Sequence, residues 1–209
     1  MLQKVTASVS LGQVAGFLVI ALTMIEMFTV PREYFVLGSI VATSSMICIS
    51  YLLNRNAHLF NWRGWHFGLA VGLAIVLYLL FYLGNFAIKN FNFFGMSPSN
   101  EQTIYGLFAN TPTPLLVVVF LLDAIGFESY FRGNLQRVFT TRLGFGAIFV
   151  SAAIDALIHL STLNPLFPAT TFVADSIWGL NYYFTRDIYS TILCHFLWDV
   201  LIFMLLPIR

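Results

Sequence analysis

The stretch LLVVVFLLDAIGFESYFRGNLQR, residues 115–137, begins as an apolar run and ends among charged side chains. Residues 115–135 alone reach the length of about 20 residues that a helix needs to cross a bilayer. Three charged residues nevertheless lie within them, Asp123, Glu128 and Arg132. Glu128 and Arg132 are four residues apart, so they share one face of a helix. The stretch therefore predicts a membrane-spanning helix with a polar face.

The composition of the whole chain indicates an integral membrane protein. Of its 209 residues, 59% are hydrophobic and 9% are charged, whereas a soluble domain has about 25% charged residues. The chain has 22 phenylalanines and almost no segments rich in Ser, Thr or Asn. The strands of a membrane β-barrel would instead alternate apolar and polar residues. The sequence therefore favours membrane helices.

Seven segments are long and apolar enough to span a membrane. They are residues 10–28, 34–53, 65–88, 115–135, 145–163, 167–185 and 189–208. We predict an all-α integral membrane bundle of about seven transmembrane helices, with residues 1–209 as a single membrane domain. The proline-containing loop 89–114 ends the plain N-terminal part, 1–114, and precedes a C-terminal core, 115–205, whose helices contain charged residues.

The positive charges predict an orientation in the membrane. One side would carry Lys4, Arg55, Arg63, Arg132, Arg137, Arg142 and Arg186, and the other side Arg32, Lys89 and Arg209. Loops rich in Lys and Arg stay in the cytoplasm. We therefore predict a cytoplasmic N-terminus, in the plasma membrane. The net charge of +1 gives no indication of a nucleic-acid partner. The two cysteines, both in apolar runs, predict no disulfide framework.

The C-terminal segments contain an unusual number of acidic and histidine side chains. These are Asp123, Glu128, Asp155, His159, Asp175, His195 and Asp199. A charged residue at the centre of a bilayer costs about 2.5–3.5 kcal/mol on insertion scales, so such residues face each other or a watery cavity and are functional by default. We therefore expect these side chains to meet inside the bundle.

Three of the polar pairs have the spacing of one helical turn. They are Glu128–Arg132, Asp155–His159 and His195–Asp199. Residues at i and i+4 share one face of a helix, so three helices would each contribute a two-member polar patch. Together the patches would hold two imidazoles, several carboxylates and a guanidinium. That set suits general acid–base chemistry, a metal ion or a proton path.

These residues, in this order, resemble the motifs of the CAAX protease and bacteriocin-processing family, also called the Abi or CPBP family. The family pattern is E-E-x-x-x-R, then F-x-x-x-H, then H-x-x-x-N/D on successive membrane helices. Here the three motifs are F-E-S-Y-F-R at 127–132, D-A-L-I-H at 155–159 and H-F-L-W-D at 195–199. The resemblance covers residues 115–205 and identifies them as a core of this type.

The resemblance implies an intramembrane endopeptidase without a cofactor, acting on a hydrophobic or lipid-modified peptide or on a membrane protein. In the family, the first glutamate and the second-motif histidine activate water, and the third motif supports the oxyanion. By position, Arg132, His159, His195 and Asp199 match the pattern, whereas Glu128 corresponds to the second, organising glutamate. The implied catalytic set is therefore Glu128, Arg132, Asp155, His159, His195 and Asp199, with Asp155 added for the reason that follows.

The chain departs from the family pattern at two positions. Phe127 replaces the first glutamate and Asp155 replaces the second-motif phenylalanine. A phenylalanine cannot accept a proton, and loss of a general base lowers a rate by about 10²–10⁴-fold. Three carboxylates could substitute: Asp155, one turn from His159; Asp123, one turn before Phe127; or Glu128, which is displaced by about 100° around the helix. Otherwise the chain is a non-catalytic pseudoprotease that binds or regulates another membrane protein.

Other interpretations of the polar residues remain open. A catalytic zinc could be held by His159, His195 and a carboxylate, although the chain has no H-E-x-x-H motif. A proton or solute carrier is less favoured because no inverted repeat is evident. Asp175 is expected to form a structural pair within the bundle. His66 is expected at the membrane interface.

Overall fold

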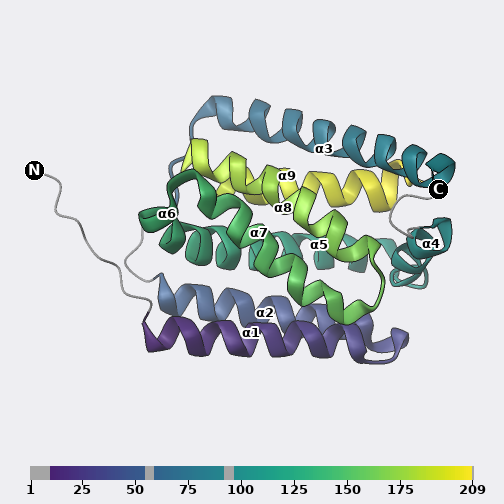
Figure 1. The fold of residues 1–209 in the computed structure, drawn as a ribbon, viewed down its shortest axis with the longest axis horizontal. Coiled ribbons are helices and arrows are strands. Elements are labelled where there is room, and N and C mark those ends of the chain that lie inside the picture. Colours follow the sequence, from purple (N-terminus) through teal and green to yellow (C-terminus); the bar gives the residue numbers. More distant parts are fainter. Residues whose placement is uncertain (1–9, 55–58, 92–96, 209) are drawn as a thin grey trace, which may run out of the picture.

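The computed structural model describes residues 10–54, 59–91 and 97–208. In these ranges the chain is helical and contains no strand. The α-helices are α1 (Leu11–Thr29), α2 (Phe35–Leu53), α3 (Gly64–Phe91), α4 (Pro98–Gly106), α5 (Thr113–Phe127), α6 (Arg137–Leu143), α7 (Ala147–Ile158), α8 (Leu166–Thr185) and α9 (Ile188–Asp199). The prediction of an all-α membrane bundle is confirmed (Figure 1).

Short helices of other types join or extend the α-helices. The 3₁₀ turns are η1 (Arg32–Tyr34), η4 (Gly144–Gly146) and η5 (His159–Thr162). Two π-helical segments, η3 (Glu128–Gln136) and η6 (Val200–Leu205), continue α5 and α9. π-Helical turns are rare and frequently lie at functional sites. The first sequence motif therefore stands on a widened helical turn and not on a regular α-helix.

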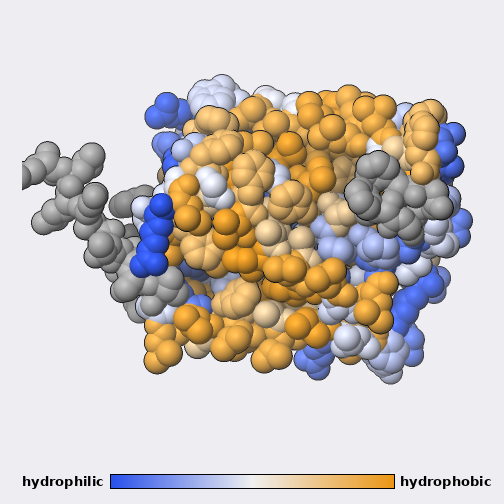
Figure 2. Space-filling view, viewed as in Figure 1, coloured by the Kyte–Doolittle hydropathy of each residue, from blue (hydrophilic) through white to orange (hydrophobic). Residues whose placement is uncertain are grey.

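Among the residues that the structure describes, five stretches are long and apolar enough to cross a membrane. They are Leu11–Thr29, Arg32–Leu53, Gly64–Phe91, Thr113–Thr162 and Ile188–Leu205. Thr113–Thr162 has 50 residues and is interrupted at Gly144, whose φ of 53° turns the chain between α6 and η4. It therefore holds two passes. Figure 2 shows hydrophobic side chains across the middle of one face and hydrophilic residues gathered at its two ends.

The long helices run side by side, so their ends form the two ends of the bundle (Figure 1). The α6 end includes the start of α3, and the α4 end includes the end of α3. Arg63 precedes α3 and Arg137 begins α6, whereas Lys89 lies in the last turn of α3. This separation matches the predicted grouping of the charges, and the cytoplasmic placement of the α6 end remains a prediction.

Helix α4 lies within the segment 89–114, which the sequence predicts to be a loop. Its start has a capping box, in which Ser97 and Asn100 bond each other's backbone N–H groups, and Pro98 follows at the first helical position. Asn85 Nδ2 of α3 donates to Glu101 at 3.0 Å, and Asn164 Nδ2 donates to Asn100 O at 2.9 Å. The loop prediction was therefore wrong at residues 98–106, where a short polar helix docks on the bundle.

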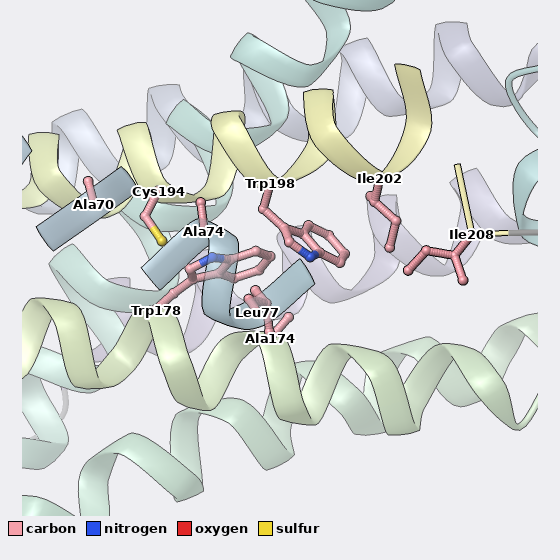
Figure 3. Close-up of a cluster of buried hydrophobic side chains, with 9 residues drawn as sticks. All are labelled: Ala70, Ala74, Leu77, Ala174, Trp178, Cys194, Trp198, Ile202 and Ile208. Carbon is pink, nitrogen blue, oxygen red and sulfur yellow. The ribbon is translucent and has the colours of Figure 1, made fainter. Parts of the chain in front are cut away.

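One hydrophobic cluster joins α3, α8 and α9 (Figure 3). It contains Ala70, Ala74, Leu77, Ala174, Trp178, Cys194, Trp198, Ile202 and Ile208. Small residues such as alanine allow membrane helices to approach closely. Cys194 is buried in this cluster and unpaired, as the sequence predicts. The cluster fixes α9, and hence the residues that follow Cys194, against α8.

His66, which the sequence predicts at the membrane interface, has its side chain buried inside the protein. It is 1% exposed, and its Nδ1 lies 3.0 Å from Asp187 Oδ2. Asp187 is the N-cap of α9 and accepts from the N–H group of Ser190 at 3.2 Å. The pair thereby ties the start of α3 to the start of α9. The sequence could not reveal this contact because its partners are 121 residues apart.

Gly126 lies where α5 meets α2, and we predict that Gly126→Ala destabilises the fold. A Cβ atom there would stand 2.9 Å from Thr43 O, a backbone atom that cannot rotate away. We expect a loss of about 1–3 kcal/mol in unfolding free energy, typical of an overpacked interface, measured by denaturant titration in detergent. Gly72→Ala is the matched control, because a Cβ there meets nothing within 4 Å. Equal losses in both variants would contradict the prediction.

Candidate active site

A cavity of about 780 Å³ is lined by residues of all the α-helices except α6, together with the turn η5. Most of its wall is apolar, with residues such as Phe28, Phe81 and Trp198. The polar side chains in the wall are concentrated on α5, α7, η5, α8 and α9 and include Asp123, Asp155, His159, Asp175, His195 and Asp199. Asp155 and His159 of the second motif and His195 and Asp199 of the third therefore line one cavity, whereas Phe127 is the residue of the first motif that reaches it.

Glu128 and Arg132 form the buried base of the site. Glu128 Oε2 accepts from Arg132 Nε at 3.1 Å, and Glu128 Oε1 is 2.8 Å from His195 Nδ1. Glu128 is 0% and Arg132 1% exposed. Both carboxylate oxygens of Glu128 are thus engaged within the protein, and Glu128 does not line the cavity. Its geometry suits the holding of His195 and does not suit the activation of a water molecule.

Arg132, on η3, connects this segment with the helices α7 and α8. Besides Glu128, it pairs with Asp175 of α8 through Nη2, and its Nη1 donates to Ser151 of α7 at 3.4 Å. Ser151 in turn donates to the backbone carbonyl of Phe131 at 3.2 Å. The planar guanidinium can serve several acceptors at once in a fixed geometry. Arg132 therefore determines where η3, α7 and α8 stand relative to one another.

His159 lies at the end of α7, where the 3₁₀ turn η5 begins. Its Nδ1 is 2.9 Å from the backbone carbonyl of Asp155 and 3.3 Å from the Asp155 carboxylate. A carbonyl oxygen only accepts, so Nδ1 carries the proton, and in the neutral ring Nε2 is free to accept a hydrogen bond. Phe28 and Phe167 flank the ring, with centroids 4.9 and 6.1 Å away.

His195 is held on both edges and on one face. Its Nδ1 meets Glu128, and its Nε2 lies 3.5 Å from Asp199 Oδ2. Trp178 stacks on the imidazole, with ring centroids 3.7 Å apart and the planes inclined by 14°. This stacking fixes the plane of the ring. The third motif therefore presents an imidazole with a defined orientation to the cavity.

Asp123 and Phe127 line the cavity from α5. Ser39 of α2 donates to Asp123 Oδ1 at 2.7 Å. Phe127, one turn later, contacts His195 with ring centroids 6.3 Å apart. The aromatic ring thus stands in the wall where the family pattern has its first glutamate. Of the three substitutes weighed from the sequence, Asp123 and Asp155 reach the cavity.

Sequence reasoning did not identify several residues that shape the site. Ser39, Ser151 and Trp178 are uncharged and belong to no motif, so the sequence carried no signal for them. Asp175 was expected to form only a structural pair. It pairs with Arg132, as expected, but it also lines the cavity, so its role is not limited to that pair.

The His, Cys, Asp and Glu side chains of the described residues are not grouped as a metal-binding site. Within residues 10–54, 59–91 and 97–208, no three His, Cys, Asp or Glu side chains are grouped suitably for a metal ion. The zinc alternative therefore finds no support in this geometry. The arrangement favours acid–base chemistry by carboxyl and imidazole groups in a largely apolar cavity.

Glu101 of α4 lies at the outer part of the cavity wall. Burial raises the pKa of this carboxyl above its ordinary value, and the nearby positive charge of Lys89 partly offsets the effect. Asn85 donates to the carboxyl at 3.0 Å. The α4 end of the cavity is therefore bordered by a partly buried carboxyl group whose pKa is raised.

Comparison with known proteins places the site in a recognised segment. A family model described as "Type II CAAX prenyl endopeptidase Rce1-like" matches residues 109–201. The matched segment begins shortly before α5 and ends in η6, so it contains all three motifs. No curated protein and no solved structure matched the chain.

Proposed function

Because the family model of Rce1-like type II CAAX prenyl endopeptidases matches residues 109–201, we propose that the chain is an active intramembrane endopeptidase. Its substrate would be a hydrophobic or lipid-modified peptide, or a membrane protein. This match supports a CAAX-type membrane protease in general. The activity of this member and the residues responsible are our proposal.

One observation carries the proposal: a carboxyl group stands beside His159 although position 127 offers none. The Asp155 carboxylate lies 3.3 Å from His159 Nδ1, and both residues line the cavity. A silent site would need no such replacement. The loss of one carboxylate at Phe127 and the presence of another at Asp155 are therefore consistent with retained chemistry.

In the proposed reaction, His159 and Asp155 activate a water molecule. His159 Nε2 would accept a proton from the water, and the Asp155 carboxylate, 3.3 Å from Nδ1 on the other edge of the ring, would stabilise the imidazolium that forms. His195, with Asp199 beside it, would stabilise the negative charge that develops on the scissile carbonyl oxygen. Arg132 and Glu128 would hold these groups in place from behind.

The surroundings support a substrate that enters from lipid. The apolar cavity wall suits a long hydrocarbon or apolar side chains, and burial contributes about 25 cal/mol per Å² of apolar surface. We also propose the plasma membrane as the location, with the α6 end and the N-terminus in the cytoplasm, from the distribution of Lys and Arg.

A cleavage assay tests the proposal. The full chain, purified in detergent, is expected to cleave hydrophobic or prenylated peptides, with fragments identified by mass spectrometry. His159→Ala should lower the rate by about 10²–10⁴-fold, as expected for removal of an acid–base group. Absence of cleavage with a broad peptide set, or undiminished cleavage by His159→Ala, would overturn the proposal.

Phe127 favours one alternative, a pseudoprotease that binds or regulates another membrane protein. Its ring occupies the cavity wall beside His195. If this alternative holds, the native chain cleaves nothing and Phe127→Glu creates activity by restoring the motif. Our proposal expects cleavage by the native chain, so the two functions give opposite results in the same assay.

A further inference from the structure

A second cavity, of about 210 Å³, shares no lining residue with the cavity of the candidate active site. Its wall is formed by α1, the end of α2, η3, α6 and α7, and it is mostly apolar, with side chains such as Phe17, Leu135 and Phe139. Pockets that enclose a whole drug-sized ligand have about 300–1,000 Å³. The second cavity is smaller, so it suits one end of a longer molecule.

Asn134 of η3 places an unpaired amide in this wall. Asn134 is 3% exposed, and neither its Nδ2 nor its Oδ1 has a hydrogen-bond partner among the described residues. Buried polar groups are nearly always hydrogen-bonded, because burial without a partner is unfavourable. Since Asn134 lines the second cavity, a molecule bound there can supply an acceptor for Nδ2 and a donor for Oδ1.

The surroundings of this amide favour an uncharged ligand. Within the described ranges, no Asp, Glu, Lys, Arg or His side chain lines the second cavity. Arg137, three residues after Asn134, is engaged elsewhere, because its Nε donates to Gly133 O at 2.8 Å and its Nη2 to Asn54 Oδ1 at 2.7 Å. A charged headgroup would therefore lose its hydration in the second cavity without gaining a counter-charge.

The second cavity lies near the α6 end of the bundle and reaches its outer surface. Its wall includes Gln13 and Val14, near the start of α1, and Leu53, the last residue of α2. Val14 is 45% exposed, and α1 is a candidate membrane span. The ends of a spanning helix stand where the hydrocarbon core, about 30 Å thick, gives way to the interfacial region of the lipids. A lipid can thus lay its acyl chain along α1 and place its polar end in the second cavity.

We propose that the second cavity binds an uncharged acylglycerol, a lipid whose head carries a free hydroxyl group beside an ester carbonyl. The carbonyl would accept from Asn134 Nδ2 and the hydroxyl would donate to Oδ1, while the acyl chain lies against the apolar wall. The lipid would thereby contact the same helical segment, η3, that contains Glu128 and Arg132. The inference is independent of the endopeptidase function, because the two cavities are separate.

Photo-crosslinking in lipid nanodiscs tests the site. The full chain is placed in phosphatidylcholine discs that contain a diacylglycerol with a photoreactive group near its head, and labelled peptides are identified by mass spectrometry. Labelling should be saturable, despite the excess of phosphatidylcholine, and should fall on residues 13–17 or 130–139, which contain most of the cavity wall. Unlabelled diacylglycerol should compete, whereas triacylglycerol, which has no hydroxyl donor, should not.

Two variants separate the hydrogen bonds of the site from its space. Asn134→Leu has a side chain of similar size without donor or acceptor, and labelling should fall about tenfold, as expected for the loss of two hydrogen bonds. Val138→Trp should abolish labelling by filling the second cavity, because Val138 lines it. Asn90→Leu is the matched control and should label normally, because Asn90 is exposed and lies near the opposite end of α3.

Stability distinguishes a ligand-binding role of Asn134 from a structural one. In discs without diacylglycerol, Asn134→Leu should be at least as stable as the native chain, because an unpaired buried amide is removed. Diacylglycerol should raise the unfolding midpoint of the native chain and not that of Asn134→Leu, since a ligand stabilises the state that it binds. Unsaturable labelling, equal labelling of Asn134→Leu, competition by triacylglycerol, or a lower stability of Asn134→Leu without diacylglycerol would each overturn the inference.

Discussion

Arg132→Ala is expected to destabilise the protein by about 3–5 kcal/mol, the usual cost of removing one partner from a buried ion pair. The guanidinium is 1% exposed and is shared by Glu128, Asp175 and Ser151. Without it, two carboxylates lose their counter-charge in an apolar interior. The unfolding free energy in detergent, from denaturant titration, measures the effect.

Arg63→Ala is the matched control for this prediction, because Arg63 is exposed and lies at the start of α3. It should change the unfolding free energy by less than about 0.5 kcal/mol, as is usual at the surface. Arg132→Lys should lie between the two, since an ammonium keeps the charge but loses the planar fork. An Arg132→Ala variant as stable as Arg63→Ala would refute the view that Arg132 organises the site.

His195→Ala is expected to lower kcat of the proposed cleavage by about 10²–10³-fold, the loss observed when one oxyanion donor is removed. His195 is fixed by Glu128 at 2.8 Å and by the Trp178 ring at 3.7 Å. That rigidity suits a group that must meet charge only as it develops in the transition state. KM should change little, because the uncharged ground state gains less from the imidazole.

His66→Gln serves as the histidine control for this experiment. His66 is as deeply buried as His195, but it belongs to the contact between α3 and Asp187 and does not line the cavity. Its loss should weaken folding and leave cleavage per folded molecule unchanged. Rates are therefore normalised to the folded fraction. Equal losses in both variants would indicate that His195 acts only through stability.

The helices themselves could be predicted from the sequence because a lipid environment permits few backbone conformations. Backbone N–H and C=O groups must be satisfied within the segment, so every long apolar run becomes a helix. All seven predicted spans are helical in the described residues. Helix α4 was missed because it lies outside the apolar runs, although Ser97, Pro98 and Asn100 carried a readable capping signal.

The site was only partly predictable. The i,i+4 pairs identified which side chains share a helix face, since that spacing is local. Which faces meet depends on helix rotation and tilt, which side-chain packing between distant segments determines. The contact between His195 and Glu128 spans 67 residues and that between Ser39 and Asp123 spans 84. The sequence does not predict that Trp178 stacks on His195, because Trp178 belongs to none of the three motifs.

The sequence alone determined the membrane class, the helices, and the three motifs in which Phe127 replaces a glutamate. These follow from local hydropathy and spacing, which need no tertiary information. The tertiary structure decided that Glu128 is engaged by Arg132 and His195, and that Asp155 and His159 line the same cavity as His195. Such contacts arise where separate helices pack together, and a one-dimensional pattern does not encode their relative rotation and depth.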